Sequence, residues 1–447
     1  MNKSILSFTA ACGILAVGGG LRAQDPVAQP GTVSRAEYDK LKTDHEQLKQ
    51  QMAEMQAQMQ QLLKQRATAA APSDGKGIVA PSNTARLDEL STEIDTLKGR
   101  VKETFPGSTK FLLAGYGTAG FTARSGSDPF FTATFNPIFL WKMSDRLLFE
   151  GEIELELEGT ETHTKLEMAH LSYVLNDYVT LSAGKFLNPT NYFVERQHMS
   201  WVNKLPDKPL AVYDGLTPEA LVGAQVRGVL PLGPTKLEYA AFVANAPSLI
   251  TSADDLAALG TLEYDNFDNQ DGHYSFGAHV GFIPIPELEI GYGFQRFTTG
   301  PRGSAVHALI QSADFSYTRD SDFLKGMINV RGQWVWSSIG GFTYDAEGAD
   351  GFGPLTFDNK RNGGYAQIAY RPTKFGNDIV KNFETVFRYD VLNQRKTLVG
   401  FDEERFTIGL NYWLGPSTVF KTAYEIDQQN GTGHGANAWL LQFATGF

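Results

Sequence analysis

This 447-residue chain has a single cysteine, fewer basic than acidic residues and few long apolar runs. The single cysteine, Cys12, excludes an intramolecular disulfide framework and a cysteine-rich zinc site. The 39 Lys and Arg residues against 50 Asp and Glu residues leave a net charge of −11, which argues against a nucleic-acid partner. Beyond the N-terminus, no apolar run approaches the roughly 18 residues that a membrane helix needs.

The chain does contain 45 glycines and 12% aromatic residues, at a mean hydropathy of −0.25. This composition is typical of a transmembrane β-barrel, because lipid-facing and lumen-facing residues alternate along its strands and average out. A soluble β-sandwich has the same alternation and remains an alternative on composition alone.

The first 23 residues have the layout of an export signal. Lys3 precedes an apolar stretch over residues 5–17, and Leu21-Arg22-Ala23 stands ahead of a polar segment. This pattern predicts a secretory signal peptide over residues 1–23, cut after Ala23. A lipidation site at Cys12 is disfavoured because the apolar stretch continues past the cysteine. The mature chain would then contain no cysteine.

Residues 24–66 carry apolar side chains at alternating spacings of three and four, which is the seam of a coiled coil. A linker rich in Ala, Pro, Ser and Gly is expected over residues 67–83, and a second short coiled-coil helix over residues 84–104. A single helix cannot bury such a seam alone, so the pattern predicts self-association. Packing of both helices onto their own domain is the alternative.

From residue 105 to the last residue, the apolar period changes from 3.5 to 2. In residues 150–158, for example, glutamates occupy one face and Ile153, Leu155 and Leu157 the other. Sixteen strands are expected, near residues 110–122, 130–142, 146–158, 164–175, 178–187, 219–230, 235–245, 272–282, 287–298, 305–319, 324–337, 362–372, 379–391, 403–414, 417–427 and 437–447.

Connection lengths separate a barrel from a sandwich. Every second connection is a short turn, and the connections between them include all the long ones, 188–218, 246–271, 338–361 and 392–402. Short turns on one rim and long loops on the other, with an even strand count, are typical of outer-membrane barrels. The fold class predicted is therefore all-β, a transmembrane antiparallel β-barrel of about 16 strands over residues 105–447, preceded by an N-terminal α-helical coiled coil; fourteen or eighteen strands remain alternatives.

The C-terminal residues give an independent indication of the same fold. Apolar side chains occupy alternate positions there, and the final residue is aromatic: Trp439, Leu441, Phe443 and Phe447. This ending resembles the strand by which outer-membrane barrels are recognised for assembly, so the barrel assembly machinery is an expected partner.

One stretch resembles the phosphate-selective porin O and P family of Gram-negative bacteria. The resemblance is carried by residues 169–173, by LSAGKF at residues 181–186, by Asn188-Pro189 and by Glu195-Arg196. It implies a sixteen-stranded outer-membrane barrel, a homotrimer, and a third external loop that folds inward to narrow the pore. The corresponding loop here is 188–218, and its expected constriction residues are Glu195, Arg196, His198, Lys204 and Lys208.

If the apolar face of each strand meets lipid, the opposite parity lines the lumen. The acidic residues predicted to line it are Glu152, Glu154, Glu156, Glu158 and Glu167. The basic residues with inward parity are Arg331, Arg388, Arg405 and Lys421. Opposed charged walls would produce a transverse field that sorts solutes by charge. The alternative is that these are ordinary solvated charges without tuned selectivity.

No enzymatic constellation is found: the chain has no HExxH, GxSxG or Walker motif, so no catalytic residue, cofactor or metal is expected. The expected function is a water-filled outer-membrane channel for passive diffusion of small hydrophilic solutes or ions. One alternative is an anion-selective or phosphate-selective porin, which the resemblance favours and the acidic excess disfavours. A second is a structural tether from the outer membrane to the cell wall through the coiled coil. Expected partners are outer-membrane lipid, lipopolysaccharide and peptidoglycan.

Overall fold

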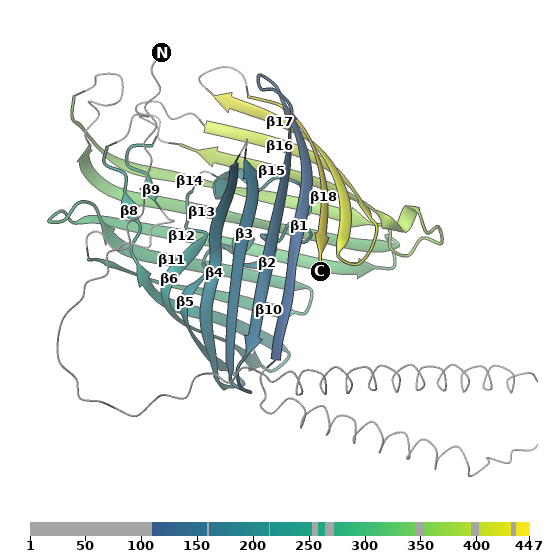
Figure 1. Ribbon diagram of the computed structural model, residues 1–447, viewed down its shortest axis with the longest axis horizontal. Coiled ribbons are helices and arrows are strands. Elements are labelled where there is room, and N and C mark those ends of the chain that lie inside the picture. The colour runs from purple at the N-terminus through teal and green to yellow at the C-terminus, as the bar shows by residue number, and fades with distance from the viewer. Residues whose placement is uncertain are drawn as a thin grey trace, which may run out of the picture. The chain divides into compact units, whose positions relative to one another are not determined.

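The computed structural model describes residues 110–158, 161–213, 215–252, 258–263, 272–344, 353–394, 402–430 and 435–447 (Figure 1). The signal peptide, the coiled coil, the linker and the second helix predicted for residues 1–104 lie outside the described residues and stay predictions.

Sixteen antiparallel strands form one closed barrel, which confirms the predicted strand number. Each strand pairs with its neighbours in the chain, apart from a short two-stranded sheet formed by β8 (Ser248–Leu249) and β9 (Leu262–Glu263). Strand β1 pairs with β18 and closes the ring. The barrel strands are β1 (Lys110–Arg124), β2 (Phe130–Lys142), β3 (Leu147–Glu158), β4 (Glu161–Asn176), β5 (Val179–Leu187), β6 (Ala220–Leu232), β7 (Thr235–Asn245), β10 (Tyr274–Ile285), β11 (Leu288–Thr299), β12 (Val306–Ser321), β13 (Gly326–Tyr344), β14 (Leu355–Arg371), β15 (Phe383–Asn393), β16 (Asp402–Trp413), β17 (Thr418–Asn430) and β18 (Ala438–Gly446).

The predicted strands overlap all sixteen, with one substantial difference. Residues 338–361 were expected to be a loop, but β13 continues to Tyr344 and β14 begins at Leu355. Phe342 pairs with Phe357 beyond a bulge, and the rings of Tyr344 and Phe357 stack with centroids 4.2 Å apart. Aromatic cross-strand pairs of this kind stabilise a hairpin beyond the body of the sheet.

The two rims of the barrel differ as predicted. The connections after β2, β4, β6, β10, β12, β14 and β16 lie at the rim where β1 begins and β18 ends, and most are tight turns. The opposite rim carries the long connections, including residues 188–219 between β5 and β6. That segment contains the short helices α3 (Tyr192–Gln197) and α4 (Leu210–Tyr213).

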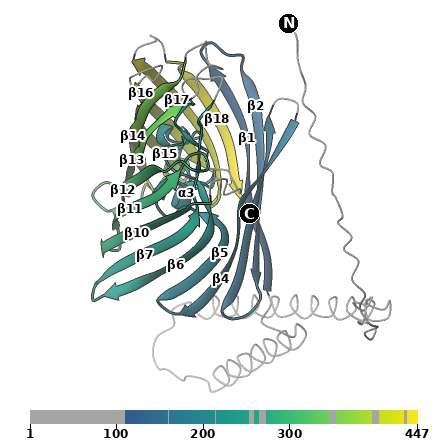
Figure 2. The same ribbon diagram turned by 90° about the vertical axis from the view of Figure 1, so that its left-hand side faces the viewer.

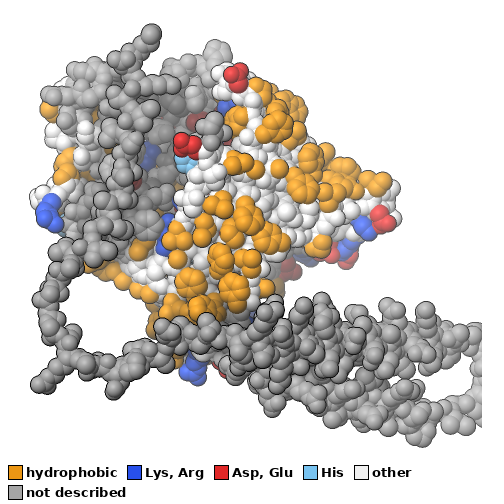
Figure 3. Space-filling model, in the orientation of Figure 1, with side chains coloured by type: hydrophobic (Ala, Val, Ile, Leu, Met, Phe, Trp, Pro, Cys, Tyr) orange, Lys and Arg blue, Asp and Glu red, His pale blue; other side chains and the backbone are white. Residues whose placement is uncertain are grey.

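Side chains alternate between a polar inner face and an apolar outer face. On β15 the inward Glu384, Arg388 and Asp390 are buried, whereas the outward Phe387 is 50% exposed. Hydrophobic side chains cover much of the outer face seen in Figure 3. An apolar outside around a polar inside is the reverse of a soluble protein, and it suits a barrel surrounded by lipid.

Part of the inner wall is apolar. The inward positions Ile310, Val335 and Ile339 pack under buried leucines of two loop segments, among them Leu216 and Leu259. The polar lining predicted from the alternation therefore ends where loops fill the barrel. In the part of the chain that the structure describes, no helix is long and apolar enough to cross a membrane.

Candidate functional site: the loop 188–218 inside the barrel

The segment 188–218 folds into the barrel, and Figure 2 shows α3 within the ring of strands. The helix begins at Tyr192 and is capped by Asn191, whose side chain accepts from the backbone N–H of Val194. The backbone N–H of Phe193 donates to Gln333 Oε1 on β13 (3.0 Å), and Gln333 Nε2 donates to Thr190 O (3.4 Å). These contacts join the start of the loop to the inner wall.

Further along the loop, five consecutive main-chain carbonyls accept hydrogen bonds from wall side chains. Asn411 Nδ2 donates to the carbonyl of residue 204 (2.8 Å), Lys421 Nζ to that of 205 (3.4 Å) and Gln442 Nε2 to that of 206 (3.5 Å). Arg388 donates to the carbonyls of residues 207 (2.9 Å) and 208 (3.0 Å). We call Arg388, Asn411, Lys421 and Gln442 the loop docking surface.

Glycines in the wall leave room for loop side chains. An ideal Cβ atom on Gly409 would lie 2.5 Å from Leu205 Cδ2, and one on Gly446 would lie 2.6 Å from Trp201 Nε1. Leu205 is fully buried and packs with wall residues that include Val386 and Leu440. Close approach of another segment is a common reason for glycine within a strand. Both glycines thus let the loop pack closely against the wall.

The four basic residues predicted for the lumen lie on the inner wall, and all are buried. Arg388, which is 2% exposed, pairs through Nε with Asp390 Oδ2 at 2.7 Å. Lys421, which is 1% exposed, also donates to the carbonyl of Ser200 and to Gln442 Oε1 (2.8 Å). Arg331 donates from Nε to Asn329 Oδ1 (2.6 Å).

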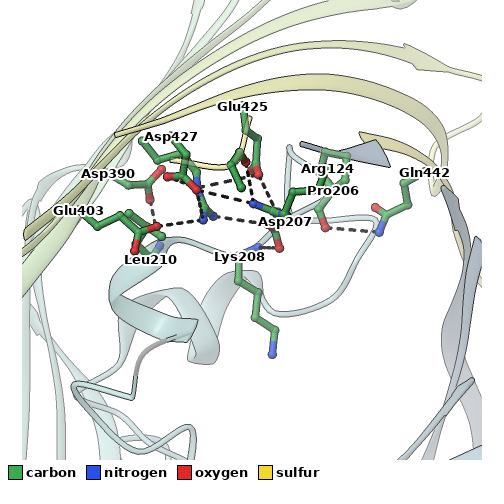
Figure 4. A network of polar contacts seen from close by, with 12 residues as sticks. Arg124, Pro206, Asp207, Lys208, Leu210, Asp390, Glu403, Glu425, Asp427 and Gln442 are labelled. Atoms are coloured by element: carbon green, nitrogen blue, oxygen red, sulfur yellow. Dashed lines mark hydrogen bonds and ion pairs between the residues drawn. The ribbon is translucent and has the colours of Figure 1, made fainter. Parts of the chain in front are cut away.

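Arg405 lies among carboxylates, of which Asp207, Glu403 and Asp427 are labelled in Figure 4. Its guanidinium contacts Asp427 (3.2 Å), Glu403 (3.3 Å) and, from the loop, Asp207 (3.5 Å). Arg124 of β1 reaches the same network through Glu425 (3.4 Å) and Asp207 (3.7 Å). The side chain of Lys208 points away from this network (Figure 4). Side chains from β1 and β16 therefore meet at Asp207.

The acidic residues predicted for the lumen face the other side of the loop. Glu152 is buried and accepts from Tyr116 Oη (2.8 Å), and its Oε2 lies 3.4 Å from His198 Nε2. Glu154 and Glu167 line a cavity together with the exposed Glu156. Glu158 ends β3, and its side chain lies outside the described part of the chain.

His198 joins the loop to this acidic wall, and the contact favours its protonated ring. Its Nδ1 lies 2.7 Å from the carbonyl oxygen of Val194, which only accepts, so Nδ1 carries a proton. Donation from Nε2 to Glu152 then requires the doubly protonated ring. Burial lowers the pKa of His198, but the hydrogen bond to Glu152 and the charge of Glu152 outweigh burial and raise it above its ordinary value.

The cavity of about 860 Å³ lies between the loop and the wall formed by β1–β4 and β18. Its lining carries more carboxylates than ammonium or guanidinium groups. The acidic residues in the lining are Glu154, Glu156, Glu167, Asp207, Glu219 and Glu263, and the basic ones are Arg124, Lys165 and Lys208, besides His198. The lining does not include Arg331, Arg388, Arg405 or Lys421, which contact the loop or lie beneath it.

The two lysines in this lining are held by carboxylates. Glu219 lies 3.0 Å from Lys208 Nζ and 3.1 Å from Lys165 Nζ, which also lies 3.2 Å from Glu167. Burial raises the pKa of Glu219, but the charges of the two lysines outweigh it and hold this pKa at about 2. Burial likewise lowers the pKa of Lys208, and Glu219 reverses the effect, so the pKa of Lys208 lies above its ordinary value.

The remaining predicted constriction residues point to other walls. Arg196 contacts Glu238 of β7 and lies 3.7 Å from Glu289 of β11, while Glu195 pairs with Arg227 of β6 at 2.7 Å. Lys204 pairs with Glu384 of β15. The five predicted loop residues are thus spread over several walls, and only His198 and Lys208 reach the cavity.

Sequence reasoning missed Arg124, Asp207 and Glu219 as members of the site. Arg124 has inward parity on its strand, so the alternation could have found it. Nothing in the loop sequence marks Asp207 or Glu219. Among the described residues, no group of three or more His, Cys, Asp or Glu side chains could hold a metal ion.

The predicted C-terminal signal residues lie on the outer face. Trp439 is 57% exposed, and the final Phe447 exchanges two backbone hydrogen bonds with Gly115 (2.9 and 3.1 Å). Its ring lies parallel to that of Phe135, with centroids 5.8 Å apart. The last residue thereby extends the pairing that closes the barrel.

No family model matches the chain, and no curated protein matches it by sequence. Among solved structures, Salmonella typhi OmpF in complex with daunomycin has 9% identity and a TM-score of 0.50, covering 77% of this chain and 99% of that chain. OmpT with loop L8 deleted, an outer-membrane protein of Vibrio cholerae, and an anion-selective porin from Comamonas acidovorans each have 12% identity and a TM-score of 0.48, covering 76% of this chain and 100% of theirs. The specific resemblance to the phosphate-selective porin O and P family is not confirmed. The barrel shares the sixteen-stranded fold of outer-membrane porins.

Proposed function

We propose that the protein is an outer-membrane channel for passive diffusion of small hydrophilic solutes. The observation that carries the proposal is the cavity between the loop 188–218 and the β1–β4 wall, inside a closed barrel with an apolar outer face. A polar interior enclosed by a lipid-facing barrel is the arrangement of water-filled porins.

The loop serves as the constriction. Its contacts reach β3 through His198, β13 through Phe193 and β15 through Arg388, so it crosses the lumen. The passage therefore runs off-centre, along the first four strands and the last strand of the barrel.

The channel prefers cations. The carboxylates in the cavity lining outnumber its cations, and Glu154 and Glu156 lie in the same row along β3. A row of like charges in a narrow polar passage attracts the opposite sign and repels its own. An anion preference, implied by the sequence resemblance, is the competing outcome.

The test uses the full mature chain, purified and folded in detergent, in planar bilayers. We expect stepwise conductance increments and, under a KCl gradient, a reversal potential with the sign of cation preference. An anion-preferring sign would restore the phosphate-porin interpretation. Absence of conductance, despite correct folding, would overturn the channel and favour the tether, which depends on residues 24–104.

Assembly with other molecules is a further part of the proposal. A homotrimer in outer-membrane lipid and lipopolysaccharide, folded by the barrel assembly machinery and in contact with peptidoglycan, follows from the sequence resemblance and the predicted coiled coil. Native mass spectrometry of the detergent-folded chain tests the trimer, and co-sedimentation with purified peptidoglycan tests wall association.

A further inference from the structure

Two buried cations of the inner wall have no carboxylate partner in the described structure. Lys421 donates to the carbonyls of Ser200 and Leu205 and to Gln442 Oε1. Arg331, which is 8% exposed, donates to Asn329 Oδ1. Their two neighbours in the predicted basic region differ, since Arg388 pairs with Asp390, and Arg405 pairs with Asp427.

The loop contacts Lys421 directly and lies next to Arg331. Two of the three acceptors around Lys421 are loop carbonyls. Arg331 lies two residues from Gln333 on the same inward face. Gln333 accepts a hydrogen bond from the backbone N–H of Phe193 and donates one to the carbonyl of Thr190, both in the loop. Arg331 is also near Lys204: burial lowers the pKa of Lys204, Glu384 opposes this, and the charge of Arg331 lowers it further.

The cations that do line the cavity are neutralised. Lys165 and Lys208 share Glu219, and Arg124 lies 3.4 Å from Glu425. The carboxylates of Glu154 and Glu156 have no such partner among the described ion pairs. The charge that a solute meets is thus the acidic excess, while two uncompensated cations lie behind the loop.

We propose that the loop 188–218 sets the charge preference of the passage by covering Arg331 and Lys421, in addition to narrowing the lumen. This inference rests on the proposed channel function. A loop displaced from the wall would expose both cations, and it would carry Asp207, His198 and Lys208 away from the cavity together. The passage would then lose its cation preference although no charged residue had been changed.

A neutral substitution can displace the loop. The Cβ of Gly409→Val would lie 2.5 Å from Cδ2 of the fully buried Leu205, so Leu205 and the loop around it must shift. Under a KCl gradient in planar bilayers, we expect this variant to conduct more and to lose most of the cation preference of the parent. Leu205→Ser, which removes the apolar anchor from the loop side, provides a second neutral variant if the first does not fold.

Two further variants assign the effect. Gly341→Val is the matched control, because a Cβ there would meet only Phe357 O at 3.9 Å, and its reversal potential should equal that of the parent. Adding Arg331→Gln and Lys421→Gln to Gly409→Val removes the exposed cations, and we expect the cation preference to return.

The outcomes are distinguishable. A loop-displaced variant with higher conductance and an unchanged reversal potential would overturn the covering role while leaving the channel intact. Failure of the two glutamine substitutions to restore the preference would assign the shift to other residues and would also overturn it. A parent protein without conductance would refute the proposed function itself.

Discussion

Nε2 of His198 lies 3.4 Å from Oε2 of Glu152, and this contact connects the loop to strand β3. The Tyr116 hydroxyl donates to the other carboxylate oxygen of Glu152 at 2.8 Å. A fixed carboxylate on the wall thus stabilises the protonated form of a histidine of the loop.

The His198–Glu152 contact makes stability depend on pH. Because the pKa of His198 is raised in the folded protein, its stabilisation is complete below about pH 6.5, the ordinary value for histidine, and is lost as the pH rises through the folded-state pKa. We expect His198→Gln to lower the thermal unfolding midpoint more at about pH 6 than at about pH 10. His307→Gln, on the outer face, is the control. Equal losses at both pH values would contradict the assignment.

Arg388 should dominate the stability of the docked loop. Arg388→Gln removes two bonds to loop carbonyls and leaves the fully buried Asp390 without its guanidinium. Breaking a buried ion pair from one side costs about 3–5 kcal/mol, so the free energy of unfolding measured in urea should fall by an amount of this order. Lys381→Gln, which breaks an exposed pair with Asp378, should leave the curve unchanged. A similar curve for both variants would refute the role of Arg388.

Glu154 and Glu156 should carry the cation preference. In the doubly substituted Glu154→Gln, Glu156→Gln protein, we expect the cation-to-anion permeability ratio to fall by roughly twofold or more, because two carboxylates leave the lining. The reversal potential under a KCl gradient gives this ratio. Glu287→Gln, in the turn between β10 and β11, removes a carboxylate outside the cavity lining and should have little effect. An unaltered ratio in the double variant would place the selectivity elsewhere.

Phe447 should be needed for efficient barrel closure. Its removal eliminates two backbone bonds to Gly115 and the ring contact with Phe135, whereas Phe447→Ala eliminates only the ring contact. We expect the fraction of heat-modifiable, folded protein on gel electrophoresis to fall in the order parent, Phe447→Ala, deletion. Phe323→Ala, in the turn after β12 and 92% exposed, is the control. Undiminished folding of the deletion variant would exclude this role.

Most of the barrel follows from local sequence. The alternation in residues 150–158 places glutamates and aliphatic residues on opposite faces, and β3 runs from Leu147 to Glu158 with that alternation. The extension of β13 and β14 was missed because Tyr344 and Phe357 stabilise it only once they are paired across the strands.

The path of the loop could not be predicted in the same way. Inward parity identified Arg388 and Lys421, but their acceptors are main-chain carbonyls about 180 and 220 residues earlier in the chain. A carbonyl has no sequence signature. The sequence therefore predicted that these cations face the solute, because it could not predict that the loop lies between them and the cavity.

The loop docking surface binds main-chain carbonyls of the loop. Asn411, Lys421, Gln442 and Arg388 bind the carbonyls of residues 204–208, and every amino acid supplies a carbonyl. Loop side chains that bind no wall residue can accordingly be exchanged while the loop keeps its path. The barrel is thus a scaffold on which permeability can diversify through loop substitutions, by evolution or by engineering, without a matching change in the strands.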